Sequence, residues 1–214
     1  LINTFSAWIS LAQKIIVFGT NAFVVTDDTS RQLQILPLAG GNFGARQDVN
    51  MGNGQAGVDL AIDPSGKYAY VVTNFVAGKN DFFVVDLSDT SKIYGYTTNV
   101  ASGLGAGDMN PRGVAAVTDN KVIVVGCNAD NGGDKCPVQS TGWIYQVFDF
   151  SSGPESANRC GGMTPLVGST TIAGINAIAG ILQASGKVFS YIVDGVNSSS
   201  EFQIVEGGTG GGGG

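Results

Sequence analysis

Residues 59 to 89 read DLAIDPSGKYAYVVTNFVAGKNDFFVVDLSD, and they contain one complete strand–turn–strand–loop–strand unit. The first run stops at the Pro-Ser-Gly of residues 64 to 66, a turn in which proline presets φ and glycine supplies a positive φ. The runs KYAYVVT and DFFVVDL that follow are rich in β-branched and aromatic residues, which favour strands. Gly78 and Asn80 lie between these runs and suit a hairpin loop. The stretch therefore predicts three consecutive antiparallel strands.

The same unit recurs along the chain. Aligned on Asn21, Lys67, Lys121 and Lys187, the units are spaced by 46, 54 and 66 residues, within or slightly above the roughly 40 to 50 residues of a propeller blade. The other predicted strands are KIIVFG, NAFVVTD, RQLQILPL, KIYGYTTNV, GVAAVT, KVIVVGC, WIYQVFDF, KVFSYIVDG and EFQIVE, with an outer strand around residues 46 to 51. The repeats predict an all-β chain, a β-propeller-like array of about four antiparallel units.

The N-terminal segment, residues 1 to 12, reads LINTFSAWISLA and fits two patterns. Ile2, Phe5 and Ile9 have a helical spacing, whereas the residues from Phe5 to Leu11 alternate with period two. We favour a strand, because a terminal segment of an all-β chain has to complete a sheet or remain loose. Such a strand could either close the propeller or enter a second chain.

Three further segments lack a plain strand signal. Residues 150 to 169 read as a loop, and residues 207 to 214 form a glycine-rich flexible tail. Residues 171 to 186, TIAGINAIAGILQASG, contain good helix formers, but Gly174 and Gly180 interrupt the run. We therefore predict strands in this segment as well.

The sequences DPSGKYAYVVTN and FFVVDLSD, within residues 63 to 89, resemble the repeat of YVTN and lactonase-type β-propellers. Those repeats carry a Pro-x-Gly turn, a Tyr-Val-Thr-Asn-like strand and a Val-x-Val-Ile-Asp-Leu-like strand. The resemblance is clearest at residues 59 to 89 and 111 to 150. It implies a propeller fold with metal or sugar-acid chemistry at the axial mouth, yet propellers of this type serve enzymes, surface proteins and scaffolds alike. No catalytic motif of the family matches this sequence residue by residue.

Composition excludes several classes of function. The 214 residues carry a net charge of −6 with only 11 Lys and Arg, so no basic stripe predicts binding to nucleic acid. No run of about 18 apolar residues predicts a membrane span. There is no histidine, which excludes a Ser-His-Asp or Cys-His nucleophile pair, a His-based zinc site and a haem axial histidine.

The acidic residues favour turns over catalysis. Asp27 and Asp28 are expected in a turn, and Asp86 and Asp149 follow the third strand of their units, where aspartate caps nearby backbone N–H groups. Asp59 and Asp63 flank the start of the second unit.

The loop NADNGGDK offers oxygen ligands for Ca²⁺, with Asp130 and Asp134 as the named carboxylates. Its spacing does not match an EF-hand, and solvated turn residues are the favoured interpretation of this loop. No other cofactor is predicted.

Cysteine spacing and one sequon suggest an extracellular location. Cys127 and Cys136 enclose a short polar loop and predict a disulfide, with two neighbouring reduced thiols as the alternative, and Cys160 is left over. Asn197 begins the only Asn-x-Ser/Thr sequon, a candidate glycosylation site. The chain starts at Leu1, which fits a product that has lost a signal peptide. We expect a secreted or cell-surface protein.

The aromatic residues alternate along strands and are expected to pack between units. Trp143 is the one aromatic residue also considered for stacking on a carbohydrate.

We expect one domain of residues 13 to 206, which lies between an N-terminal strand and a flexible tail. The sequence as a whole suggests a non-enzymatic structural or interaction protein. Ile2, Phe5, Trp8 and Ile9 would close the array or enter an identical subunit, giving a head-to-tail oligomer or filament. The alternatives are a lactonase-like or other metal-dependent propeller hydrolase, and a propeller that binds glycans.

Overall fold

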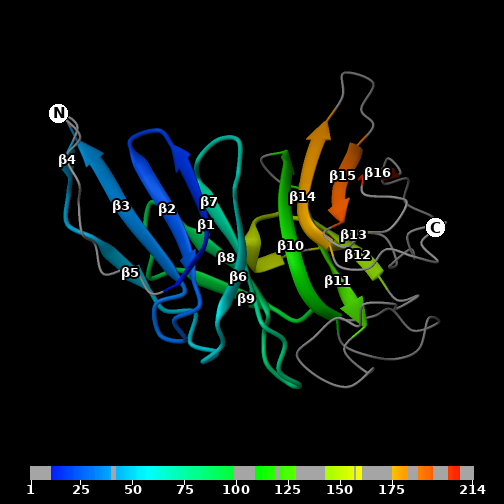
Figure 1. The fold of residues 1–214 in the computed structure, drawn as a ribbon, viewed down its shortest axis with the longest axis horizontal. Coiled ribbons are helices and arrows are strands. Elements are labelled where there is room, and N and C mark those ends of the chain that lie inside the picture. Colours follow the sequence, from blue (N-terminus) through cyan, green and yellow to red (C-terminus); the bar gives the residue numbers. More distant parts are fainter. Residues whose placement is uncertain are drawn as a thin grey trace.

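Most of the described strands form where the sequence predicts them, and within each sheet the pairing is antiparallel, mainly between strands consecutive in the chain. The computed structural model describes residues 11–39, 42–98, 109–118, 121–128, 143–156, 158–160, 175–182, 188–194 and 202–207. The described strands fall into four sheets that follow one another along the long axis of the molecule, from β1 to β16 (Figure 1).

The first sheet has the order β1-β2-β3-β4, with β5 also paired to β3. Its strands are β1 (Ala12–Phe18), β2 (Asn21–Thr26), β3 (Leu33–Ala39), β4 (Asn42–Phe43) and β5 (Gln47–Val49). The outer strand expected near residues 46 to 51 is confirmed as β5, whereas β4 was not expected in that glycine-rich connection.

The second sheet is the unit quoted from residues 59 to 89, extended by one outer strand. Its strands are β6 (Gly57–Ile62), β7 (Tyr68–Thr73), β8 (Phe82–Asp86) and β9 (Ile93–Tyr96). Gly66 and Gly78, in the two turns, have φ of 74° and 75°, which confirms the turn chemistry inferred for both. Every residue of β7 and β8 is buried, because neighbouring sheets cover both faces.

The third and fourth sheets are β10-β11-β12-β13 and β14-β15-β16. Their strands are β10 (Met109–Thr118), β11 (Lys121–Asn128), β12 (Trp143–Asp149), β13 (Asn158–Cys160), β14 (Ile175–Leu182), β15 (Val188–Asp194) and β16 (Phe202–Gly207). The strands predicted in residues 171 to 186 are confirmed by β14. The loop predicted for residues 150 to 169 is wrong in part, since a 3-10 turn (Pro154–Ser156) and β13 lie within it.

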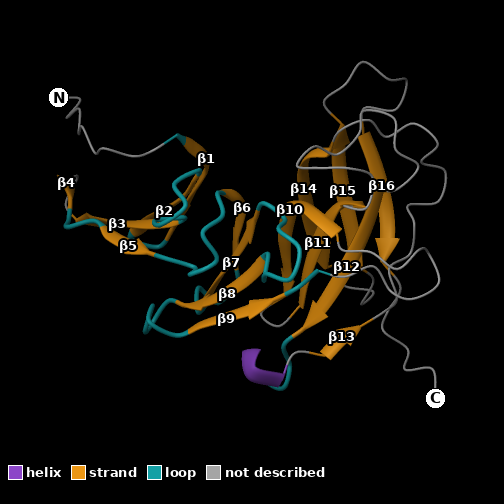
Figure 2. Ribbon diagram, turned by 90° about the horizontal axis from the view of Figure 1, so that it is seen from below, coloured by secondary structure: helices purple, strands orange, loops and turns teal. Residues whose placement is uncertain are grey.

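The sheets stack face to face, with the first strands of consecutive sheets (β1, β6, β10 and β14) side by side. Figure 2 shows the same succession, with the first sheet and the fourth at opposite ends. Substantial contacts among the described strands join consecutive sheets only. The chain is an all-β, β-propeller-like array of four antiparallel sheets, and closure by residues 1 to 12 stays a prediction.

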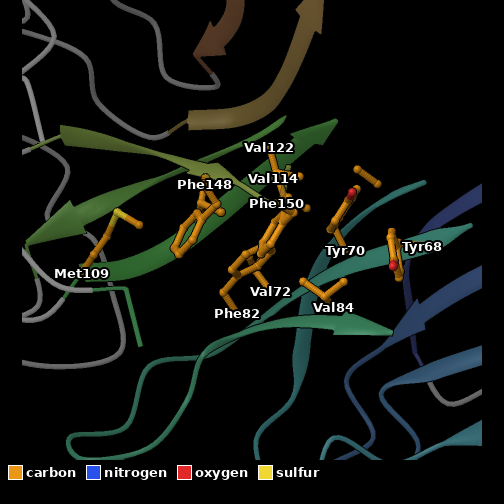
Figure 3. Packing of buried hydrophobic residues seen from close by; sticks show 12 residues of the cluster. Tyr68, Tyr70, Val72, Phe82, Val84, Met109, Val114, Val122, Phe148 and Phe150 are labelled. Carbon is orange, nitrogen blue, oxygen red and sulfur yellow. The ribbon is translucent and has the colours of Figure 1, made fainter. Parts of the chain in front are cut away.

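Two clusters of buried side chains fill the first two junctions. One lies between the first and second sheets and is largely aliphatic, around Val25, Leu33 and Leu60. The other lies between the second and third sheets and is rich in aromatic rings, around Tyr70, Phe82 and Phe148 (Figure 3). The alternating aromatic residues whose side chains the structure describes therefore pack between sheets, as the sequence predicted.

Candidate functional site

The first strands of the four sheets share an irregularity at the same end. In each, the register shifts by one residue near the strand's start, which leaves Gln13, Val58, Arg112 and Asn176 as the extra residues. A bulge bends its strand and redirects the next side chain, and bulges are over-represented beside functional sites. We call this row of four bulges the bulge row, and it defines the candidate site.

One carboxylate in the bulge row connects three sheets. Asp59, directly after the bulge of β6, has its Oδ1 2.7 Å from Nζ of Lys14, directly after the bulge of β1. Its Oδ2 accepts a hydrogen bond of 2.9 Å from the backbone N–H of Val114 in β10. The Asp59 side chain is 11% exposed and that of Lys14 36% exposed. The pair is therefore partly shielded from solvent and ties the sheets together at their inner strands.

A second polar contact lies on the next bulge. Nη1 of Arg112 is 3.4 Å from Oδ1 of Asn74, which follows β7 in the second sheet. Asn74 in turn donates its backbone N–H to the carbonyl of Ala56, just before β6. Charged groups in the bulge row thus contact the adjacent sheet.

Two other buried carboxylates, those of Asp81 and Asp63, also accept several hydrogen bonds. Asp81 accepts bonds of 2.8 Å from both the N–H and the hydroxyl of Thr98, which fixes the end of the second sheet beside the first residue of β10. Asp63 accepts bonds from Ser65 and from the N–H of Tyr68 across its turn. These hydrogen bonds hold the backbone of a sheet end and of a turn in place.

A short turn motif, Asp-x-Ser, recurs at the ends of strands. In each copy the serine backbone N–H bonds to the aspartate carboxylate two residues earlier, and the aspartates are Asp28, Asp63, Asp86, Asp89 and Asp149. This confirms the turn expected at residues 27 and 28 and the capping expected of Asp86 and Asp149. Hydroxyl groups of Ser88 and Ser91 donate to Asp86 and Asp89 and lower the pKa of both carboxyls from the ordinary value.

A buried amide network links the first sheet to the second. Nδ2 of Asn53 donates to Oγ1 of Thr73 at 2.7 Å and to the carbonyl of Asn80 at 3.0 Å. Gln32 donates to the carbonyls of Thr29 and Gln55, and its Oε1 accepts the backbone N–H of Met51 at 3.0 Å. This network was not predicted, because it joins Gln32 and Thr73 of two predicted strands to Asn53 in a glycine-rich connection, and no local pattern indicates that these segments meet.

Several predicted site residues lie outside the described residues. These are Asp130, Asp134, Cys136, Asn197, Ile2, Phe5, Trp8 and Ile9. Cys127, Trp143 and Cys160 lie in β11, β12 and β13, but their side chains are outside the described part of the structure. The disulfide, the Ca²⁺ site, the glycan and the carbohydrate-stacking role therefore stay predictions. Within the described residues, no three His, Cys, Asp or Glu side chains lie close enough together to hold a metal ion.

The Lys14–Asp59 pair is a feature of the bulge row that the sequence did not predict. Asp59 was noted as an acidic residue, but no sequence signal indicated its partner. The pair could have been predicted only from the fact that Lys14 and Asp59, which carry opposite charges, each follow a bulge in neighbouring first strands. A bulge can be identified only when the pairing of the strands is known.

Comparison with known proteins finds solved structures of a similar fold class but does not assign the chain to a family. No profile of a known protein family matches the chain, and no curated protein matches its sequence. Among the described residues, no helix is long and apolar enough to cross a membrane.

Solved structures with similar folds include WD40 and glycoside hydrolase propellers. The WD40 domain of Neurospora crassa Pan2 is 12% identical, with a TM-score of 0.45 over 91% of this chain and 51% of that chain. The GH74 enzyme of Niastella koreensis is 14% identical, with a TM-score of 0.48 over 86% of this chain and 28% of that chain. Bacteroides ovatus GH43B is 13% identical, with a TM-score of 0.44 over 92% of this chain and 41% of that chain.

The chain thus spans about half or less of the length of these solved structures. Its assignment as a propeller-like repeat protein rests on its own four sheets and on the way they stack. The finer resemblance to YVTN and lactonase-type repeats stays a prediction.

Proposed function

We propose that this chain is a non-enzymatic structural or interaction protein of the YVTN-like propeller class, secreted or held at the cell surface, which associates with identical subunits. The observation that carries the proposal is the use of the buried carboxylates. Asp59, Asp63 and Asp81 each bind backbone N–H groups that fix a sheet or a turn. A propeller whose buried charges are engaged in this way is built as a rigid frame.

The ends of the array support self-association. The fourth sheet has three described strands, whereas the second and third have four each, and a sheet with an open edge can accept a further strand. Residues 1 to 10, which precede the first sheet, would supply an apolar strand for that edge. Burying its large side chains would contribute about 1.5 to 3 kcal/mol for each that is fully buried, before ordering costs.

Sedimentation velocity over a range of concentrations tests this proposal. The parent chain should associate, and a variant lacking residues 1 to 10 should stay monomeric and folded. The deletion stops at residue 10 because the carbonyl of Leu11 accepts the N–H of Asp27 and β1 begins at Ala12. Adding a peptide of residues 1 to 10 should restore binding at the vacated edge. A peptide with serine at Ile2, Phe5, Trp8 and Ile9 is the matched control.

Two results would overturn the proposal. One is a parent chain that remains strictly monomeric at high concentration. The other is lactone hydrolysis that a chelator abolishes and that returns with one stoichiometric divalent ion, since this would indicate a lactonase-like enzyme. The proposed extracellular location is tested separately by the mass of the unreduced protein from its native source, which reports a Cys127–Cys136 disulfide and a glycan at Asn197.

A further inference from the structure

The exposed apolar side chains of the described residues gather in one part of the molecule. Five large ones are exposed, and all belong to the first sheet or to the residue directly before it, namely Leu11, Ile15, Val17, Phe18 and Phe43. Ile15 and Val17 in β1 are 61% and 63% exposed. Exposure of single apolar residues does not by itself identify a binding surface, but the place of these two in the fold does.

Ile15 and Val17 occupy positions that recur in the first strands of the next two sheets. They are the second and fourth residues after the extra residue of the bulge. In all three sheets the cross-strand partner of the second position is a valine. The residues at the two positions are Leu60 and Ile62 in β6, and Val114 and Ala116 in β10.

In the second and third sheets, these two positions pack against the sheet that comes before. Leu60 is fully buried and lies with Ile62 in the cluster between the first and second sheets. Val114 is 1% exposed and lies with Ala116 in the cluster between the second and third sheets. The two positions therefore belong to the side of a sheet that receives the preceding sheet.

The first sheet has the same apolar positions but no described sheet before it. Ile16 packs toward the second sheet, and side chains alternate along a strand, so Ile15 and Val17 point away from that sheet. We call these two residues the β1 strip. Their cross-strand partners, Val24 and Ala22, are 1% and 2% exposed, so the accessible surface is confined to β1.

The opposite end of the array has the complementary side. Each described junction places the first strand of one sheet beside the first strand of the next. In the fourth sheet, β14 contacts β10 and β11 of the third sheet, and among the described strands it has no substantial contact with a following sheet or with β1. The first and fourth sheets lie at opposite ends of the molecule (Figure 2). The β1 strip is therefore not covered by the fourth sheet of its own chain.

We propose that the β1 strip is an interaction surface for a second copy of this chain, whose fourth sheet packs on it with β14 beside β1. The contact repeats between copies the arrangement that β1 and β6 have within one copy. It buries Ile15 and Val17 as the other junctions bury Leu60 and Val114, and removal of these apolar groups from water drives the association.

This inference deepens the proposed function and rests on it in one respect, the association of identical subunits. It assigns the contact to a face of the first sheet, and it uses side chains of β1 alone. Strand addition and the β1 strip can therefore be tested with different variants.

Sedimentation velocity of the full chain and of Ile15→Glu tests the surface. The variant should keep the parent's circular dichroism, because Ile15 is exposed, and should associate at least about tenfold more weakly, because the junction would bury a charge. Val17→Glu tests the strip a second time. The matched control is Phe43→Glu, which places the same charge on an exposed apolar residue at the far edge of the same sheet and should associate as the parent does. Unweakened association of the two strip variants, or an equal loss in the control, overturns the inference.

A mixing experiment identifies the partner surface. Ile15→Glu retains its own fourth sheet, so a trace of the fluorescently labelled variant should bind excess parent although it does not bind itself. Fluorescence-detected sedimentation measures both reactions. A variant that binds neither itself nor the parent would overturn the fourth sheet as the partner and would indicate that two β1 strips pack on each other.

The variant lacking residues 1 to 10 separates this inference from the proposed strand addition. Association that is lost in the deletion but kept in Ile15→Glu would overturn the β1 strip and support strand addition. Association that is lost in Ile15→Glu but kept in the deletion would support the β1 strip and contradict strand addition. A parent chain that is strictly monomeric at high concentration would overturn both.

Discussion

Between the second and third sheets the junction is filled by rings, whereas between the first and second it is filled by aliphatic side chains, a buried amide network and a glycine. Phe82 lies among the rings, with centroids 4.6 Å from Phe148 and 5.9 Å from Tyr96. In the other junction, a Cβ on Gly57 would lie 2.4 Å from Cγ2 of Val25 and 2.7 Å from the carbonyl oxygen of Thr26.

The difference shows that similar sheets can be packed together in two ways. Large rings fill the second junction, so that junction should be most sensitive to the loss of atoms. Close backbone approach leaves no room in the first junction, so that junction should be sensitive to added atoms and to the loss of hydrogen bonds. The following experiments test this contrast.

Removing a ring should have the largest effect. Phe82→Ala is expected to lower the free energy of unfolding by about 3 to 5 kcal/mol, because Phe82 is fully buried and contacts rings from both sheets. Urea unfolding measures the change. The control is Phe43→Ala, a ring that is 40% exposed, where the loss should stay within about 1 kcal/mol. Equal losses in the two variants would contradict the role given to the ring cluster.

Adding one methyl group to the other junction should have the next largest effect. Gly57→Ala should lower the free energy of unfolding by about 1 to 3 kcal/mol, since Val25 and the Thr26 carbonyl occupy the space. In a Val25→Ala background the same substitution should cost less, and the remaining cost reports the clash with the carbonyl. If the cost is unchanged in that background, the side-chain contact is not its cause.

Breaking the amide network should lower the free energy of unfolding by a similar amount. Asn53→Ala removes the donor to Thr73 and to the Asn80 carbonyl, and a loss of about 1 to 3 kcal/mol is expected because buried partners are left unpaired. The exposed Asn50, whose Oδ1 accepts the N–H of Gly52 at 2.8 Å, provides the control. Asn50→Ala should change the free energy of unfolding by about 0.5 kcal/mol or less.

The ion pair in the bulge row should contribute a smaller, salt-dependent amount. A double-mutant cycle of Lys14→Gln and Asp59→Asn should give a coupling free energy of about 1 kcal/mol at low salt, because Lys14 is partly exposed and the pair is screened. Thermal unfolding at low and high salt measures the coupling. A coupling of zero at low salt would mean that the pair forms without stabilising the sheets.

The smallest effect is expected on the pH dependence of the free energy of unfolding in acid. The pKa of Asp86 is lowered in the folded state by the Ser88 hydroxyl, so its stabilising contribution is complete above the unfolded pKa of about 3.9. That contribution is lost as the pH falls through the folded pKa. Ser88→Ala should therefore flatten the fall in stability below about pH 4 and leave the slope near pH 7 unchanged. An unchanged acid slope would contradict this coupling.

The strands of the second sheet could be predicted because every local signal agrees. Turn residues at 64 to 66 bound two runs whose residues prefer strands, and both runs are buried in the fold. Strand β13 could not be predicted in this way. Its sequence, NRC, has no strand preference, and it forms only because three residues pair with the edge of β12.

The candidate site was less predictable than the fold, for a different reason. Lys14 and Asp59 meet because β1 and β6 lie side by side and both carry a bulge, and neither fact leaves a local signature. The amide network likewise joins Gln32 to a segment some twenty residues later. Sequence patterns report the neighbours of a residue along the chain, whereas these contacts depend on how whole sheets are placed.

The position of Asp59 also bears on how the protein opens. Its carboxylate binds a cation from the sheet before it and a backbone N–H from the sheet after it. Moving either the first or the third sheet away from the second would leave the partly buried Asp59 carboxylate with only one of its two partners. In both cases the free-energy cost arises at this one carboxylate. The first three sheets should therefore loosen together as one cooperative unit.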